Sequence, residues 1–210
     1  VNLLPEQWDS NNLGRATKVA AYALRAKRYM QLHNWTNAKS DLQWLVEGNG
    51  KHYYDLVANY EDNFTKDTEN NIESVFEIQY SDVHKAPAGD GDFDVDPNLG
   101  LNRGQFFAPP GIGWTDGELR PWIVDEFKKE KDINGNYDIR LKYTAFYEGM
   151  NQDFTDNNRI YRYRLDGADA NIWNLQNWKG RVFFRKYGSD YYRDYDDYHN
   201  PTNVRLIRYA

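Results

Sequence analysis

Residues 14–48 read GRATKVAAYALRAKRYMQLHNWTNAKSDLQWLVEG and have the most regular periodicity in the chain. Apolar side chains recur there at helical spacing, first in a longer run and then, after a break at Asn34, in a shorter one. Gly48 follows the second run as a stop signal. The pattern therefore predicts two helices, Arg15–His33 and Thr36–Glu47, and so short a turn requires them to pack antiparallel.

Small residues dominate the predicted contact between these helices, and they allow the two backbones to approach closely. The first helix repeats apolar positions at Ala16, Val19, Ala20, Ala23, Leu24 and Met30. The second helix repeats them at Ala38, Leu42 and Leu45. Asn11 or Asn12 is the expected N-cap of the first helix.

The composition indicates a polar, folded and unusually aromatic chain. Its 210 residues include 7 Trp, 17 Tyr and 10 Phe, and disordered chains are poor in such residues. The formal net charge of −6 argues against binding to a nucleic-acid backbone, which requires a basic face. The chain has no cysteine, so a thiol nucleophile, a disulfide and a cysteine-based metal site are excluded.

Beyond the two helices the predicted elements are short. Alternating side chains predict a strand over Ser74–Tyr80, helical spacing returns over Pro121–Lys131, and Arg181–Tyr187 has the character of a strand. Residues 81–117 carry most of the Gly and Pro, which makes this a loop of unusual length. No apolar run approaches the length of a membrane span, and neither terminus shows a boundary signal, so we expect a piece of a longer protein.

The order of the motifs resembles that of the SusD/RagB-like proteins. In that family a tetratricopeptide-type hairpin precedes a "Y-x-L…Y…F…E-x-x-F-E-I-Q-Y" stretch, which this chain matches at Tyr54, Leu56, Tyr60, Phe64, Glu73, Phe76, Glu77, Ile78, Gln79 and Tyr80. A family pattern "L-V-x-x-F…D-x-R" is matched by Ile123–Phe127, Asp138 and Arg140. Phe184–Tyr187 and Asn203–Ala210 resemble two further family segments.

The resemblance implies a fold class and a domain plan. The fold is expected to be mainly α, with a tetratricopeptide-like hairpin over residues 13–48, a fragment of an α-α superhelix. A long, irregular, aromatic-rich loop region and few short strands complete it. Residues 1–210 would be one SusD-like domain fragment, and residues 81–117 would be the loop on the ligand side. In the family the last segment, Asn203–Ala210 here, opens another long helix.

The resemblance also implies a function. Family members are surface-exposed outer-membrane lipoproteins that capture oligosaccharides or polysaccharides without catalysis and cap a TonB-dependent, SusC-like transporter. For this chain the implied location is the cell surface, with membrane attachment only through a lipid anchor outside the fragment. The implied partners are a glycan and the transporter, and no cofactor is expected.

Candidate ligand residues combine flat rings with polar edges, as the binding of a sugar requires. The first group is Trp114, Phe107, Arg103 and Asn102, and the second contains Trp173 and Trp178. For any single ring, packing in a core is the competing interpretation. Trp35 and Trp44 belong to the helical hairpin and are expected to be packing residues.

Signatures of catalysis and metal binding are absent from the sequence. The acidic run over residues 90–96 lacks the Gly and Glu that a calcium loop requires, and a solvated loop is expected there. A turn is expected at Asn134-Gly135. Carboxylates such as Glu118, Asp125 and Glu126 do not by themselves indicate a glycosidase, since that activity depends on their separation in space.

Two alternatives to a glycan-binding protein remain at this stage. One is a helical-repeat scaffold for a protein partner, because a single helical hairpin needs stacked neighbours to be stable. The other is a carbohydrate-active hydrolase, which would need two carboxylates facing each other in a cleft. Aromatic and amide residues outside the hairpin favour the glycan-binding interpretation.

Overall fold

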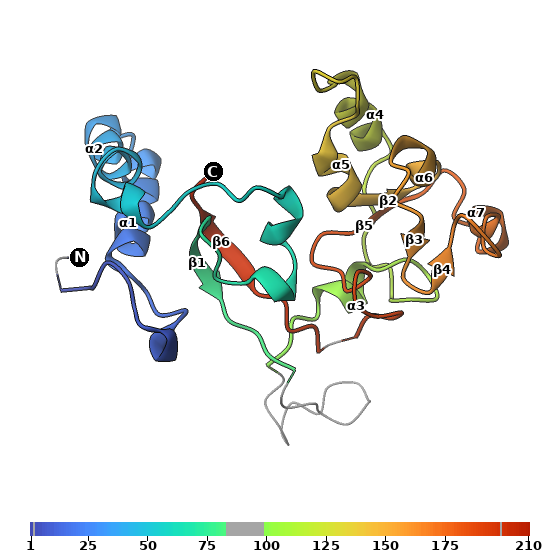
Figure 1. Cartoon of the computed structure of the whole chain (residues 1–210), viewed down its shortest axis with the longest axis horizontal. Coiled ribbons are helices and arrows are strands. Elements are labelled where there is room, and N and C mark those ends of the chain that lie inside the picture. Colours follow the sequence, from blue (N-terminus) through green and yellow to red (C-terminus); the bar gives the residue numbers. More distant parts are fainter. Residues whose placement is uncertain (2, 83–98, 198) are drawn as a thin grey trace. The chain divides into compact units, whose positions relative to one another are not determined.

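The computed structural model describes the chain except for residues 2, 83–98 and 198. The chain forms two compact units, which are described separately (Figure 1). Unit 1 comprises Val1–Gln79 and Asn203–Ala210, and unit 2 comprises Tyr80–Thr202.

Unit 1 contains the predicted pair of helices, α1 (Lys18–Gln31) and α2 (Trp35–Val46). Thr17 begins α1 as its N-cap, since its Oγ1 accepts a hydrogen bond from the Ala20 backbone N–H at 3.1 Å. The predicted cap at Asn11 or Asn12 is wrong, because both residues belong to the preceding 3₁₀ turn η1 (Ser10–Asn12). Asn34 caps α2 by accepting from the Asn37 backbone N–H at 3.3 Å.

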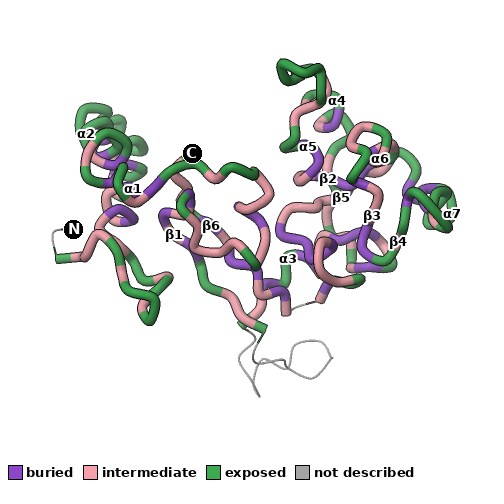
Figure 2. The backbone as a smooth tube through the Cα atoms, viewed as in Figure 1, coloured by how far each residue is buried: buried purple, intermediate pink, exposed green. Residues whose placement is uncertain are grey.

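Helices α1 and α2 pack through small side chains, as predicted. The buried positions of α1 are Val19, Ala20, Ala23 and Ala26, and Ala38 and Leu45 are buried on α2 (Figure 2). One ion pair joins the two helices: the Arg25 guanidinium donates to both carboxylate oxygens of Asp41, at 2.8 and 2.7 Å. Asp41 is buried, so this bidentate pair holds the helices in one register.

Several large apolar side chains of the helical hairpin are exposed. Leu24 is 63% exposed and Met30 is 44% exposed. Successive helical residues are rotated by roughly 100°, so burial of Ala23 and Ala26 turns Leu24 outward. Trp44 packs against the core of unit 1 and stacks on Tyr22 at 4.3 Å, but the expected packing role of Trp35 is wrong, because that ring is 60% exposed.

After α2 come three short 3₁₀ turns and a strand. These are η2 (Asn49–His52), η3 (Tyr60–Asn63), η4 (Lys66–Thr68) and β1 (Ser74–Ile78). The predicted strand is confirmed. Its partner is β6 (Val204–Arg208), which pairs antiparallel with β1. The helix that the family resemblance implied for this last segment is therefore wrong over Val204–Arg208, where Arg205 of β6 pairs with Glu77 of β1.

Unit 2 is a chain of short elements around an aromatic core. Its helices are α3 (Arg103–Phe107), α4 (Trp122–Lys129), α5 (Ile139–Thr144), α6 (Met150–Asp153) and α7 (Ile172–Leu175). Its strands are β2 (Ala145–Tyr147), β3 (Arg159–Ile160), β4 (Tyr163–Arg164) and β5 (Val182–Phe184). Two antiparallel pairs form, β2 with β5 and β3 with β4.

Three predictions within unit 2 are confirmed. Helix α4 lies within the predicted Pro121–Lys131, and β5 lies within the predicted Arg181–Tyr187. The expected turn also forms, because Gly135 adopts a φ of +82° and its N–H donates to the Asp132 carbonyl at 3.0 Å. The Asp132 side chain closes this turn by accepting from the backbone N–H groups of Asn134 and Asn136, each at 2.8 Å.

Candidate functional site

The exposed indole of the first predicted ligand group is Trp114, whose side chain is 49% exposed. Its segment folds back along α3. The Trp114 N–H donates to the Gln105 carbonyl at 2.8 Å, and the Asp116 N–H donates to the Phe106 carbonyl at 2.8 Å. Farther along, Thr115 Oγ1 donates to the Ala108 carbonyl at 2.9 Å. These bonds fix where the indole projects, although the segment has no regular secondary structure.

Two side chains of α3 orient the Trp114 ring. Phe106 meets it edge-on, with ring centroids 5.2 Å apart and planes 78° apart. With the Gln105 amide turned so that both of its ends are satisfied, its oxygen accepts from Trp114 Nε1 at 3.0 Å. A ring supported at its edge and held at its N–H keeps a defined orientation while half of its surface stays in solvent.

Glycine is required at two positions near Trp114, one in α3 and one directly before the indole. A Cβ at Gly113 would clash with the Gln105 carbonyl oxygen, which receives the Trp114 backbone hydrogen bond. A Cβ at Gly104 would clash with the carboxylate of Asp196. The close approach of α3 to both groups therefore depends on the absence of a side chain at these positions.

Helix α3 packs at Gly104 against the buried carboxylate of Asp196. This carboxylate accepts from Tyr161 Oη at 2.7 Å, from the Ser189 N–H at 3.0 Å and from Arg193 at 2.9 Å. Burial raises the pKa of Asp196, and these partners act against that shift. Burial also raises the pKa of the Tyr161 hydroxyl well above its ordinary value, so Tyr161 remains a donor at neutral pH.

The other residues of the first predicted group have different environments. Asn102 and Arg103 are exposed at the start of α3, and the Arg103 guanidinium lies 5.4 Å from the centroid of the Tyr187 ring. Phe107 is half-buried and packs against Phe184, with centroids 5.2 Å apart. Trp114, Asn102 and Arg103 are thus accessible to a ligand, whereas Phe107 mainly supports the fold.

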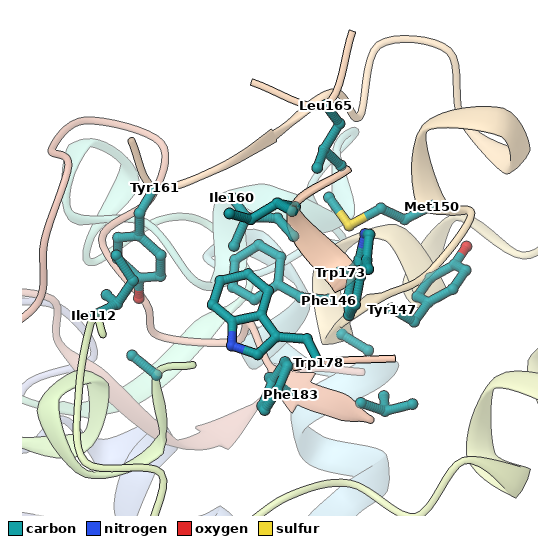
Figure 3. Close-up of a cluster of buried hydrophobic side chains, with 14 of the residues drawn as sticks. Ile112, Phe146, Tyr147, Met150, Ile160, Tyr161, Leu165, Trp173, Trp178 and Phe183 are labelled. Carbon is teal, nitrogen blue, oxygen red and sulfur yellow. The ribbon is translucent and has the colours of Figure 1, made fainter. Parts of the chain in front are cut away.

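Both indoles of the second predicted group belong to the core of unit 2. Trp178 is 0% exposed and Trp173 is 5% exposed, and the two rings meet edge-on at 5.8 Å (Figure 3). Phe183 contacts both of them. Neither indole has an exposed ring face on which a sugar could stack in this structure. In this chain, which is rich in aromatic residues, the two indoles fill the core of unit 2.

The structure adds support residues that the predictions from sequence missed. Asp196 stands in the run RDYDDY, which reads as a solvated acidic segment, and yet it is the buried anchor of α3. Only the coordinates reveal that Gly104 lies against it. The signal available in the sequence was the Gly between two large side chains, which marks a close backbone approach without naming the neighbour.

The described residues include no group of three or more His, Asp or Glu side chains arranged to hold a metal ion. The acidic run at residues 90–96 lies outside them, as does part of the predicted loop 81–117. Glu118 pairs with Arg181, and Glu126 pairs with Lys129 at 2.5 Å. In the same described part, every helix is too short or too polar to cross a bilayer.

No protein-family model and no curated protein matches the sequence. Solved structures do match it. A SusD superfamily protein from Bacteroides vulgatus ATCC 8482 aligns with a TM-score of 0.72 and 26% identity, covering 99% of this chain and 39% of its own. A laminarin-binding SusD-like protein aligns with a TM-score of 0.67 and 18% identity, covering 100% of this chain and 44% of its own.

A third match is surface glycan-binding protein A from Bacteroides thetaiotaomicron in complex with laminarihexaose. It has a TM-score of 0.61 and 24% identity, and the alignment covers 99% of this chain and 44% of that one. The chain thus spans about two fifths of the length of the structures it matches. As the order of its sequence motifs predicted, the chain has the fold of the SusD superfamily.

Proposed function

We propose that this chain is part of a non-catalytic glycan-binding protein that works at the cell surface in the uptake of oligosaccharides or polysaccharides. The observation that carries the proposal is the half-exposed, oriented indole of Trp114 in a fold whose solved neighbours include surface glycan-binding proteins. The two units would belong to one SusD-like domain, with residues 81–117 on the ligand side.

The chemistry of Trp114 suits a neutral sugar. The indole face can stack on the CH-rich face of a pyranose ring. At the start of α3, the exposed amide of Asn102 and guanidinium of Arg103 can donate hydrogen bonds to the hydroxyl groups of the sugar. Stacking needs no charge on the ligand. Few counterions are displaced when a neutral ligand binds, so we expect weak binding that changes little with salt.

The helical hairpin over residues 13–48 supports the second part of the proposal, a protein partner. Large apolar side chains are exposed on both helices, among them Leu24 at 63%, Trp35 at 60% and Leu42 at 39%. We assign this hairpin to a tetratricopeptide-like superhelix in the longer protein, where it would pack on further helices or on a TonB-dependent, SusC-like transporter. Attachment to the outer membrane would come from a lipid anchor outside this chain.

Hydrolysis is the less favoured function. Several solved neighbours carry the name of binding proteins, and two of the three carboxylates considered from the sequence are engaged with cations, Glu118 with Arg181 and Glu126 with Lys129. Release of reducing sugar by the protein, abolished by a single carboxylate substitution, would favour the hydrolase instead.

The test compares two exposed indoles of unit 2. Trp114→Ala should weaken glycan binding by up to about tenfold, since an aromatic contact contributes about 0.5–1.5 kcal/mol. Trp122→Ala is the matched control, because that indole is 58% exposed on α4. Binding is measured by calorimetry on the full chain, with ligands found in a glycan array and with laminarihexaose as a first probe.

Three results bear on this test. A selective loss in Trp114→Ala, with an unchanged melting temperature, supports the site. Equal affinities for the two variants would remove Trp114 from it. Absence of binding to every glycan on the array would contradict the proposed function itself.

A further inference from the structure

Unit 1 contains a cavity of about 460 Å³, a volume within the range of small-molecule sites. It lies between the segment that precedes α1, the residues around the turn η2, and the loop that leads into β1. Residues that line it include Gln7, Trp8, Arg15, His52, Tyr53 and Asn70. Rings, amides and one guanidinium thus meet around a single space, all within unit 1.

The walls of this cavity are fixed by hydrogen bonds. Trp8 Nε1 donates to the Ala16 carbonyl at 3.0 Å, and Tyr53 Oη donates to the carboxylate of Glu6 at 2.8 Å. Gly14, with a φ of +86°, lies so close to the side chain of Gln79 that a Cβ there would clash. The segment before α1 is therefore held in place, although it has little regular structure.

Arg15 gives the cavity its charge. Its guanidinium carbon lies 5.7 Å from the centroid of the Trp8 ring, and within the described part of the chain no carboxylate lies at ion-pair distance from it. The nearby acids are already engaged: Glu77 pairs with Arg205 at 3.1 Å, and Glu6 pairs with Lys18 at 3.5 Å and accepts from Tyr53. Among the described residues that line the cavity, the charge without an ion-pair partner is therefore positive, in a chain whose net charge is −6.

We propose that this cavity binds an acidic sugar, a uronic acid residue, through its carboxylate and its ring. A guanidinium presents two parallel donors to a carboxylate, and in Arg15 this group lies over the Trp8 ring. The rings of Trp8 and Tyr53 offer faces to the CH groups of the sugar. Gln7 and His52, whose side chains make no hydrogen bond to the described residues, supply contacts for its hydroxyl groups.

The proposed ligand rests on the glycan-binding function, and the site is separate from Trp114, which lies in unit 2. The charge of the ligand makes the two sites distinguishable. Binding of a carboxylate to Arg15 should weaken as salt is raised, because the charges at a partly exposed site are screened. Stacking of a neutral sugar on Trp114 should not respond in this way.

The experiment is a titration of the full chain with D-glucuronate, followed by amide NMR shifts and by calorimetry. D-Glucose, acetate and inorganic phosphate are the comparison ligands. We expect glucuronate to shift the amides of residues 7–8, 14–15 and 52–53, with glucose, acetate and phosphate each binding at least about tenfold more weakly. Loss of a hydrogen bond to a charged group corresponds to a change of that size.

Substitutions test whether glucuronate binds at Arg15 rather than elsewhere in the chain. Arg15→Gln should reduce the affinity for glucuronate by at least about tenfold. Arg162→Gln is the matched control, because that guanidinium also lies over a ring, Tyr163, but in unit 2. Trp114→Ala should leave glucuronate binding unchanged even where it weakens binding of a neutral glycan, so the two proposals can fail separately.

Several outcomes would overturn the proposal. Equal affinity for glucose would remove the role of the carboxylate, and equal affinity for acetate or phosphate would leave an anion site with no preference for a sugar. Amide shifts confined to unit 2 would place the ligand elsewhere. These shifts are measured on the unsubstituted chain, so they decide the matter even if Arg15→Gln fails to fold.

Discussion

The two units stabilise a two-stranded sheet through different side-chain interactions. Each contains an antiparallel pair of strands, β1 with β6 in unit 1 and β2 with β5 in unit 2, and a two-stranded sheet is marginal by itself. In unit 1 a buried ion pair joins the two strands, since Glu77 and Arg205 pair with side chains 1% and 0% exposed. In unit 2 the contact is aromatic, since Phe146 faces Phe183 across the sheet and both are fully buried.

This difference explains what the family-like motifs of unit 1 do. The acidic positions of the EIQY stretch meet the basic positions of the last segment: Glu77 with Arg205, and Glu73 with Arg208 at 3.2 Å. Asn203 completes the network by donating to Glu77 at 2.9 Å. The motif residues contact one another, so the segments that carry the resemblance help to determine the fold of unit 1.

Arg205→Ala should have the largest effect on stability. It leaves the carboxylate of Glu77 buried without its cation, a change that destabilises proteins by about 3–5 kcal/mol. The Arg205 guanidinium also donates to the carbonyls of Asp62 and Thr68, at 3.1 and 2.9 Å, and those acceptors lose a partner. Urea unfolding measures the total loss, and amide hydrogen exchange in β1 locates it.

Trp178→Ala is the counterpart in unit 2. Truncation of a buried aromatic side chain costs about 3–5 kcal/mol, so the two variants should lose similar stability for different reasons. Hydrogen exchange should accelerate in β5 for Trp178→Ala and in β1 for Arg205→Ala. If both variants accelerate both strands equally, the units unfold together and the contrast between them does not extend to their energetics.

A pH titration should show a smaller effect in unit 1. Burial raises the pKa of Glu69 to about 7 from its ordinary 4.5, although the Asn203 backbone N–H donates to it at 2.7 Å. The folded state therefore holds this proton more tightly than the unfolded state does. The resulting stability is present below pH 4.5 and is lost as the pH rises toward 7, by on the order of 1–2 kcal/mol once solvent screening is discounted.

Glu69→Gln isolates that contribution. The amide keeps an acceptor for the Asn203 N–H and removes the titration, so the difference in unfolding free energy between wild type and variant should change between pH 4.5 and 7 and level off above it. A difference that stays constant across this window would show that Glu69 titrates normally in the folded chain.

Sequence patterns that span only a few residues correctly predicted the elements whose structure depends on those residues. The helical hairpin, β1, α4, β5 and the turn at Gly135 follow from periodicity and turn chemistry over a few residues. The fate of the last segment depends on a distant partner, because Arg205 and Arg208 become strand residues by pairing with carboxylates about 130 positions earlier. Sequence alone carries no record of that pairing.

The candidate ligand residues show the same limit. Trp114 and Trp178 have similar polar, aromatic neighbours in the sequence, yet one is 49% exposed and the other is fully buried. Burial is a property of the tertiary structure, so residue type could nominate both indoles but could not choose between them. The exposure of Trp114 depends on its hydrogen bonds to α3, and α3 in turn packs against Asp196 at Gly104.

The smallest expected effect tests where α1 begins. Thr17 caps the helix by accepting from the Ala20 N–H, so Thr17→Ala leaves that N–H without its partner and should cost about 1 kcal/mol. Thr17→Ser retains the hydroxyl and should remain within about 0.5 kcal/mol of wild type. Asn11→Ala, at one of the two caps expected from sequence, should be equally mild, since Asn11 lies in η1 and is exposed. Urea unfolding separates the three variants. A larger loss of unfolding free energy for Asn11→Ala than for Thr17→Ala would contradict the assignment of Thr17 as the N-cap and would favour a helix that begins at the earlier residues.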